Sequence, residues 1–248
     1  MDLRTYAVRA LKRMLPRSLV RAITYRAETR YAARLPDKGR AAVFESIYRD
    51  GIWGGRAEGE DFHSGSGSHE PAIVEPYVAA VSRFLDGLGQ RPVVVEIGCG
   101  DFFVGSRLID SCNRYVACDI VGSLIDRNRL RYSHPRLSFQ VVDAVKDPLP
   151  HGDVLIIRQV LQHLSNADIA QIVGKFAAYR HVLITEHLPS IESFTPNLDK
   201  PTGFDTRLKC SSGVVLTAEP FNLKPESSFV LCEVPEQVGI VRTVVYTN

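Results

Sequence analysis

The sequence predicts an α/β fold in which helices cover a mostly parallel sheet and an antiparallel hairpin completes that sheet. Between residues 93 and 186, short apolar runs typical of strands buried on both faces alternate with segments of helical periodicity. Repeated strand–helix units of this kind build a doubly wound sheet with right-handed crossovers. Near the C-terminus, two strand-like segments are joined by the turn PEQVG, which is too short for a crossover.

The individual elements follow from local signals. A helical stretch from Ala41 is ended by Gly51, and a longer helix begins near Pro71 and ends near Gly87. The first strand, VVVEI, is followed at once by GCGDFFVG. The predicted strands are residues 93–97, 114–120, 137–143, 153–158, 181–186, 229–234 and 240–247, with helices at about 124–132 and 166–179 between them.

The composition is that of an ordinary globular protein. With 45% hydrophobic and 23% charged residues, the 248-residue chain is neither disordered nor collagen-like. Its five scattered cysteines never form a CxxC pair, which argues against a disulfide framework and a zinc ribbon. No apolar run approaches the roughly 20 residues that span a bilayer, and the N-terminus lacks a secretory signal. We therefore expect a cytoplasmic protein without a membrane span.

The N-terminal part, residues 1–70, is predicted to be a basic helical extension of the main domain at 71–248. Residues 1–40 hold eleven Lys or Arg against three acidic residues, a balance of +8 that leaves −6 for the rest. Apolar residues from Leu3 to Met14 recur at helical spacing and predict an amphipathic helix that ends near Pro16. We expect this helix to pack on the main domain or to form a homo-oligomer; nucleic acid or anionic lipid is the alternative.

The small polar stretch SGSGS, Ser64–Ser68, is either a linker or a lid. Glycine and serine bury little surface, which favours a disordered connector. However, Trp53, His63, His69 and Glu70 crowd the same segment. Because mobile loops commonly close over ligands, these residues favour the lid.

The glycine loop after the first strand marks the expected ligand site. Ligands of a doubly wound sheet bind outside the carboxyl ends of the strands beside the first strand, which is where Gly98 and Gly100 fall. Glycine lets the backbone turn tightly and approach a ligand, and free amides near a helix start can meet its polar groups. Phe103 stands at the third glycine position of GxGxxG, which argues against a dinucleotide.

An acidic residue stands at each of three neighbouring strand ends: Glu96, Asp119 and Asp143. An aspartate at a strand end also commonly caps a turn or helix, but three in register with one glycine loop favour a ligand with cationic and hydroxyl groups. S-adenosylmethionine carries a sulfonium, an ammonium and a ribose diol, and it has no bulky phosphate.

The segments VVVEIGCGD, ACDI, VVDA and DVLIIRQVLQHL together resemble the motif series of the class I S-adenosylmethionine-dependent methyltransferases, bacterial small-molecule and saccharide O-methyltransferases among them. The resemblance covers roughly residues 71–248 and implies a seven-stranded Rossmann-like sheet. It implies S-adenosylmethionine as the cofactor, with S-adenosylhomocysteine as its product. The cofactor-binding residues that it implies are Ser66 and Ser68 in a covering segment, Glu96, Gly98 and Gly100 at the methionine part, Asp119 and Ile120 at the ribose, Asp143 and Ala144 at the adenine, and Arg158 and Gln159 beside the cofactor.

The candidate catalytic residues follow the fourth and fifth strands. Methyl transfer is an in-line displacement that depends on positioning, and a base is needed only when the nucleophile, such as a hydroxyl, holds its proton. His163, Glu186 and His187 are the candidate bases, because neighbouring strands bring them to the substrate face; packing alone is the alternative for His163. A divalent metal, with Asp199 or Asp205 as further ligands, is another reading that no ligand spacing supports.

The sequence thus predicts an O-methyltransferase acting on a small hydroxylated metabolite. We expect a sugar or saccharide, because the expected pocket residues are polar and the loop at 197–207 is polar too, whether it faces substrate or solvent. A nucleic-acid methyltransferase that uses the basic N-terminus is one alternative. The segment IRQVLQ lacks the Asp or Asn, Pro, Pro, aromatic motif of base-amine methylation, so nucleic acid is disfavoured. A non-catalytic cofactor-binding module is the other alternative.

Overall fold

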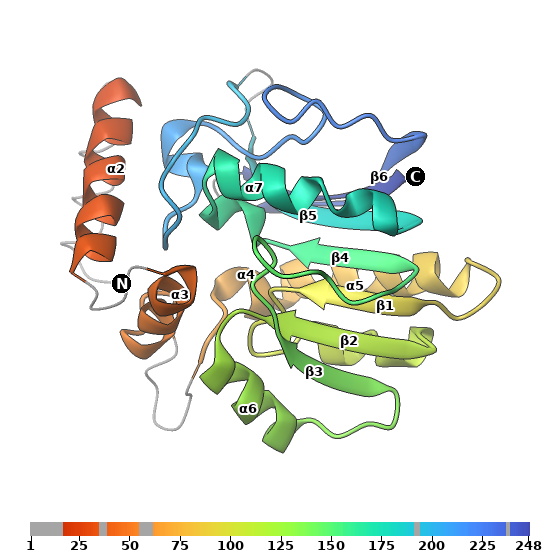
Figure 1. The fold of residues 1–248 in the computed structure, drawn as a ribbon. Coiled ribbons are helices and arrows are strands. Elements are labelled where there is room, and N and C mark those ends of the chain that lie inside the picture. Colours follow the sequence, from red (N-terminus) through yellow and green to blue (C-terminus); the bar gives the residue numbers. More distant parts are fainter. Residues whose placement is uncertain (1–16, 35–38, 55–61, 191–193, 237–238) are drawn as a thin grey trace.

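The protein structure is a computed structural model that describes residues 17–34, 39–54, 62–190, 194–236 and 239–248. The predicted amphipathic helix from Leu3 to Met14 lies outside these residues. The helices, arranged as in Figure 1, are α2 (Arg17–Ala33), α3 (Arg40–Arg49), α4 (Ser66–His69), α5 (Pro71–Asp86), α6 (Gly122–Arg131) and α7 (Asn166–Val173). The strands are β1 (Val93–Ile97), β2 (Arg114–Asp119), β3 (Leu137–Val141), β4 (Val154–Arg158), β5 (His181–Pro189), β6 (Ser227–Glu236) and β7 (Gly239–Thr247).

The seven strands form one sheet in the order β3-β2-β1-β4-β5-β7-β6. The first five strands in this order pair in parallel, and β7 pairs antiparallel with both β5 and β6. The prediction of a mostly parallel, doubly wound sheet with a terminal antiparallel hairpin is confirmed. Because the strand order reverses between β1 and β4, a crevice is expected at the carboxyl ends of these two strands.

Several predicted elements differ in length from the observed ones, and two of the differences have a clear cause. Strand β5 continues three residues beyond the predicted end at 186, because its pairing with β7 extends to Pro189 opposite Gly239. The helix predicted at 166–179 ends at Val173, where Gly174 caps it, and residues 176–178 form a separate 3-10 turn.

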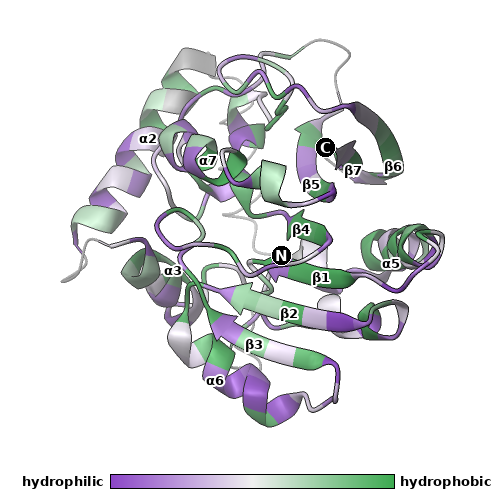
Figure 2. Ribbon diagram, turned by 45° about the vertical axis from the view of Figure 1, so that its right-hand side comes forward, coloured by the Kyte–Doolittle hydropathy of each residue, from purple (hydrophilic) through white to green (hydrophobic). Residues whose placement is uncertain are grey.

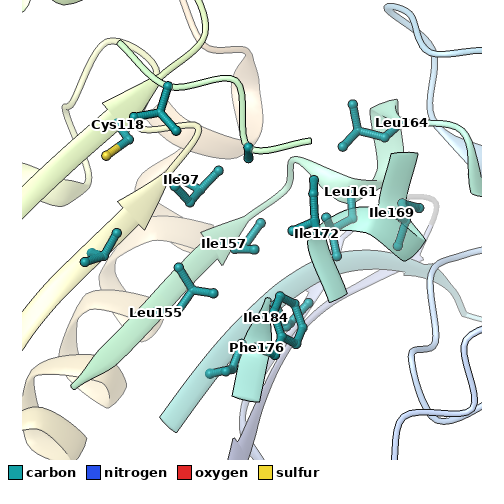
Figure 3. Close-up of a cluster of buried hydrophobic side chains, with 14 of the residues drawn as sticks. Ile97, Cys118, Leu155, Ile157, Leu161, Leu164, Ile169, Ile172, Phe176 and Ile184 are labelled. Atoms are coloured by element: carbon teal, nitrogen blue, oxygen red, sulfur yellow. The ribbon is translucent and has the colours of Figure 1, made fainter. Parts of the chain in front are cut away.

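The core has two layers, one on each face of the sheet. Strands β1 and β4 are largely hydrophobic along their length (Figure 2), as expected for strands covered on both sides. On one face, α5 packs against alternate strand residues such as Val94 and Ile156. On the other face, Ile169 and Ile172 of α7 point toward the strands that carry Leu155, Ile157 and Ile184 (Figure 3).

The two N-terminal helices attach to the domain in different ways. Helix α3 buries Val43, Phe44 and Ile47 in the same core layer as α7. Helix α2 lies at the outside (Figure 1) and buries a narrow stripe of Val20, Thr24 and Glu28. None of the helices in the described ranges is long and apolar enough to cross a membrane.

Candidate cofactor and acceptor site

A cavity of about 310 Å³ lies at the carboxyl ends of the parallel strands, within the usual size range of small-molecule sites. Its wall combines strand ends with α3, the segment around α4 and the loop before residue 207. Among the sequence-predicted residues, the structure places Ser68, Glu96, Gly98, Gly100, Asp119, Ile120, Asp143, Ala144, Arg158, Gln159, His163 and His187 on this wall. The Ser66 side chain lies outside the described part of the chain, and Glu186 does not line the cavity.

The glycine loop has no room for side chains. Gly98 and Gly100 have φ angles of +72° and +54°, a left-handed region that favours glycine. A Cβ on Gly98 would lie 2.3 Å from Cγ2 of Val160, and one on Gly100 would lie 2.3 Å from Oγ of Ser64. The backbone can therefore form a close-fitting cradle for a ligand only with glycine at both positions.

Two of the three strand-end acids are buried beside this loop. The two carboxylate oxygens of Asp119 accept hydrogen bonds from the amides of Gly100 (3.1 Å) and Val121 (3.0 Å), yet burial keeps the pKa of Asp119 above its ordinary value. Glu96 accepts a hydrogen bond from the hydroxyl of Tyr115 at 3.0 Å, and burial raises the pKa of Glu96 to about 7. A cationic ligand beside Glu96 would favour its ionised form.

The third acid, Asp143, is held by the N-terminal part of the chain. Arg40 of α3 donates to both Asp143 oxygens, at 2.8 and 3.3 Å, and it also donates to Asp168 at 3.1 Å. Burial acts to raise the pKa of Asp143, but the bonds from Arg40 and the Val145 amide outweigh it and the pKa is lowered. Helix α3 is thereby fixed over the end of the cavity where adenine is expected.

The segment at 62–69 lies against the glycine loop. Arg158 donates to the Gly67 carbonyl oxygen at 2.5 Å and to Ser68 Oγ at 3.1 Å. Asp101 accepts from the Ser64 amide at 3.0 Å, and its Oδ2 lies 2.6 Å from Nε2 of His69. Asp101, which was not predicted as a site residue, joins this segment to the glycine loop, where the cofactor is expected.

The three candidate bases have different environments. The His163 ring lies 4.8 Å from the Trp53 ring, and burial, assisted by the charge of Lys200, lowers the pKa of His163 to about 3. His187 Nε2 lies 3.1 Å from a Glu236 carboxylate oxygen, and burial lowers the pKa of His187. Both histidines line the cavity.

Glu186 is separated from the other two candidates. Because β5 continues through residues 186 and 187, the two side chains face opposite sides of the sheet. Glu186 accepts a hydrogen bond from the Leu161 amide at 3.1 Å, and burial raises its pKa to about 8. Glu186 thus stabilises the loop after β4 through Leu161 without lining the cavity itself.

The loop at 197–207 contributes Phe204, Asp205 and Thr206 to the cavity wall. Arg207 is 2% exposed and fixes this loop to the one after β4 by donating to the Leu161, Gln162, Leu164 and Leu198 carbonyls. In the described part of the chain, no group of three or more His, Cys, Asp and Glu residues could hold a metal ion.

Several wall residues were not selected from the sequence. Tyr48, Trp53, Phe204 and Glu236 lie on the wall, although they belong to segments far apart in the chain. The sequence did indicate two of the segments concerned: Trp53 lies near the predicted lid, and Phe204 lies in the polar loop at 197–207 that was considered as a substrate-facing loop. Glu236 carried no sequence signal, since it lies in the turn region of a predicted hairpin.

Comparisons with known proteins agree with this geometry. A family model described as a methyltransferase domain matches residues 95–178. Magnesium protoporphyrin IX methyltransferase from Synechocystis PCC 6803, solved with bound S-adenosylmethionine, superposes with a TM-score of 0.53 at 12% identity, covering 86% of this chain and 99% of that one. N-methyltransferase NodS from Bradyrhizobium japonicum WM9, in complex with S-adenosylhomocysteine, gives 0.51 at 13% identity, covering 71% and 88%. No curated protein sequence matches the chain.

The matched domain and the fold agree with each other. Residues 95–178 match a methyltransferase domain, and the sheet has the Rossmann-like fold of S-adenosylmethionine-dependent methyltransferases, which supports S-adenosylmethionine as the cofactor. The two similar structures carry the names of a porphyrin methyltransferase and an N-methyltransferase, so this likeness leaves the acceptor open.

The residues present fit this cofactor. Gly98 and Gly100 lie on the cavity wall and leave no room for a Cβ, and the buried Arg158 Nε has no hydrogen-bond partner within the described residues. A carboxylate offers about four lone-pair sites, so Asp119 keeps capacity for ribose hydroxyls after accepting two amides. Glu96 offers a buried carboxylate to the cofactor's amino group.

Proposed function

We propose that this methyltransferase methylates a hydroxyl group of a small polar acceptor, with a sugar or saccharide as the favoured class. One observation carries the proposal. Two buried hydrogen-bonding atoms that have no partner within the described residues, Gln162 Oε1 and His163 Nδ1, lie on the cavity wall beyond the cofactor residues, together with the ion pair of His187 and Glu236. A buried polar atom without a partner costs about 1–3 kcal/mol, so a ligand that bonds to these atoms is favoured.

The chemical character of these atoms supports a hydroxylated ligand. Gln162 Oε1 and Glu236 Oε2 can only accept hydrogen bonds unless the carboxyl is protonated, and each histidine nitrogen can accept in one tautomer. An acceptor with several hydroxyls supplies the matching donors. An amine could donate as well, but it would bring fewer donors to this wall than an acceptor with several hydroxyls.

The proposal assigns the proton-accepting role to His187. A hydroxyl must lose its proton during attack, and the base must be within hydrogen-bond reach. Of the three candidates, Glu186 does not line the cavity, and the low pKa of His163, about 3, makes it a poor proton acceptor. His187 lines the cavity, and the Glu236 carboxylate 3.1 Å away would stabilise the imidazolium that forms.

The remaining work of the chain is positioning. When bound, S-adenosylmethionine supplies a methyl group that is already activated on a sulfonium. Glu96, Asp119 and the glycine loop would hold the cofactor in place, and the segment at 62–69 would cover it. His187 would accept the proton that the acceptor hydroxyl loses when it receives the methyl group.

A panel of acceptors tests the proposal. The protein is incubated with S-adenosylmethionine carrying a labelled methyl group and with saccharides, phenols, amines, thiols, and RNA and DNA oligonucleotides. We expect label on saccharide hydroxyls, and label on phenols alone would keep O-methylation but change the substrate class. Transfer only to amines, thiols or nucleic acid would refute the proposal. The oligonucleotides test the phosphate affinity that the basic N-terminal segment predicts.

A further inference from the structure

Helix α2 is joined to the cavity wall through a buried ion pair. The Glu28 carboxylate of α2 has a fully buried side chain, and its Oε1 lies 3.0 Å from Nζ of Lys200, whose side chain is 8% exposed. The same Oε1 accepts a hydrogen bond from the amide of Asp205 at 2.9 Å. Lys200 also donates to the carbonyl oxygens of Pro201 (2.6 Å) and His163 (3.3 Å). One carboxylate thus contacts both ends of the short segment 200–205.

This segment forms part of the wall beside the candidate bases. Trp53 donates from Nε1 to the Phe204 carbonyl oxygen at 3.2 Å, and the Trp53 ring packs on His163. Tyr31 of α2 adds an edge-on contact to the Phe204 ring, with ring centroids 5.5 Å apart. The contacts therefore run without a break from α2 through Phe204 to the Trp53 ring.

The ion pair has little freedom to rearrange. Two charges removed from water are tolerated only while they stay paired, so moving the loop away from α2 would strand both. The space is also filled, because a Cβ on Gly203 would lie 3.0 Å from Glu28 Oε1. The loop is thus held in one position relative to the helix.

We propose that α2 is a built-in part of the acceptor site, in which Glu28 and Lys200 are positioning residues that hold residues 203–206 against Trp53 and His163. The inference rests on the proposed function in one respect, namely that this wall faces the acceptor. The predicted cofactor residues lie at the ends of β1 to β4 and in the segment 62–69, whereas the pair holds residues 203–206. The pair should therefore affect acceptor use and leave cofactor affinity unchanged.

The sole tryptophan, Trp53, reports directly on this arrangement. Three variants of the full chain are compared with the unaltered protein: Glu28→Gln, which keeps an acceptor for the Asp205 amide, Lys200→Met, which keeps the aliphatic stem, and the double variant, which leaves no unpaired charge. Arg26→Gln, at an exposed position on the same helix, is the matched control. Tryptophan emission, acrylamide quenching and calorimetric affinity for S-adenosylhomocysteine are measured for each.

In the two single variants we expect a red-shifted, more readily quenched emission with unchanged S-adenosylhomocysteine affinity, and the control should match the unaltered protein. With an acceptor found in the panel, kcat/KM for that acceptor should fall by roughly 10²-fold, the size of loss that a 1 Å misplacement can cause, while KM for S-adenosylmethionine stays the same. If the single variants do not fold, the double variant decides by the same measurements.

Unchanged Trp53 emission in the folded variants, or an equal loss of S-adenosylhomocysteine affinity, would overturn the inference. These outcomes are distinct from failure of the proposed function. That function fails if no hydroxyl acceptor is methylated, whereas the emission and calorimetric measurements need no acceptor at all.

Discussion

The two halves of the cavity are built in different ways. In the cofactor half, the strand-end acids come from neighbouring parallel strands, and Asp119 is bonded by amides within 20 residues of it along the chain. In the acceptor half, the wall joins segments that are far apart in the sequence. His163 follows β4, His187 lies in β5, Glu236 ends β6, and Trp53 reaches across to Phe204.

This difference concerns hydrogen bonding as well as sequence distance. Both oxygens of Asp119 have partners in the structure without any ligand, so this carboxylate is held in place in advance. In the acceptor half, Gln162 and His163 instead each keep a buried atom that has no partner within the described residues. We infer that the cofactor half is preorganised by the sheet, whereas the acceptor half acquires part of its bonding only from a ligand. Substitutions in the two halves should therefore change different observables.

The largest expected effect is the loss of turnover in His187→Ala. General base catalysis contributes typically about 10²–10⁴-fold, so kcat with a hydroxyl acceptor should fall by that factor. Affinity for S-adenosylhomocysteine, measured by calorimetry, should stay the same, because the cofactor residues are untouched. His151→Ala, an exposed position, is the control. A parallel loss of cofactor affinity would show that the two halves are not separable at this residue.

A second prediction concerns pH and stability without ligand. Burial raises the pKa of Glu96 to about 7 and that of Glu186 to about 8, whereas both would titrate near 4.5 in the unfolded chain. Between these values each folded carboxyl binds more protons than the unfolded one, so the stability that these two groups contribute is full below about pH 4.5 and is lost as pH rises toward 8. The lowered pKa of His163, about 3, acts in the opposite direction up to about pH 6.5, so the two carboxyls are isolated by comparing variants. Each carboxyl should contribute on the order of 3–5 kcal/mol.

The same experiment distinguishes the two halves. Urea unfolding at several pH values is compared for the unaltered protein, Glu96→Gln and Glu186→Gln, each of which should flatten the pH dependence. Saturating S-adenosylmethionine should restore stability near neutral pH through Glu96, because its ammonium favours the ionised carboxylate. It should have no such effect on the contribution of Glu186. The same pH dependence in the unaltered protein and in both variants would contradict both assignments.

The contrast also explains what could be predicted from the sequence. Glu96, Gly98 and Asp119 each lie at the end of a strand or directly after it, and strand ends are marked by local apolar patterns, so their convergence on one crevice follows from topology. The pairing of His187 with Glu236 depends instead on the arrangement of β5, β7 and β6 at their ends, which no local pattern specifies.

Helix α2 could not be predicted for a related reason. Its buried stripe includes Thr24 and Glu28, so it lacks the apolar face by which a packed helix is normally detected. Glu28 is buried only because Lys200, 172 residues later, is there to pair with it. Likewise, neighbours on β5 face opposite sides, and only the continuation of that strand through Pro189 shows that Glu186 and His187 separate.

A third prediction tests the preorganisation of the glycine loop. Gly98→Ala should lower the free energy of unfolding by about 1–3 kcal/mol, the cost of a strained backbone region, and should also reduce S-adenosylhomocysteine affinity because the new Cβ displaces Val160. Gly89→Ala is the matched control, since Gly89 has a φ of +77° but nothing within 4 Å of its Cβ position. If Gly89→Ala lowered stability and S-adenosylhomocysteine affinity as much as Gly98→Ala does, backbone strain alone would account for the effect of Gly98→Ala, and the contact with Val160 would contribute nothing.

The smallest predicted effect concerns a contact that departs from the contrast between the halves. Arg40 and Asp143 are 103 residues apart, yet their ion pair lies in the cofactor half and fixes α3 over it. Both side chains are 19% exposed, so solvent screens the pair and its contribution should be about 1 kcal/mol. Arg40→Met should then weaken S-adenosylhomocysteine binding about fivefold.

A control variant is Asp168→Asn, which removes the other carboxylate bonded to Arg40. It separates the contribution of the bond to Asp143 from that of the bond to Asp168. If Arg40→Met changed acceptor turnover but left S-adenosylhomocysteine binding unchanged, α3 would belong to the acceptor half, and the cofactor half would consist of the sheet and its loops alone.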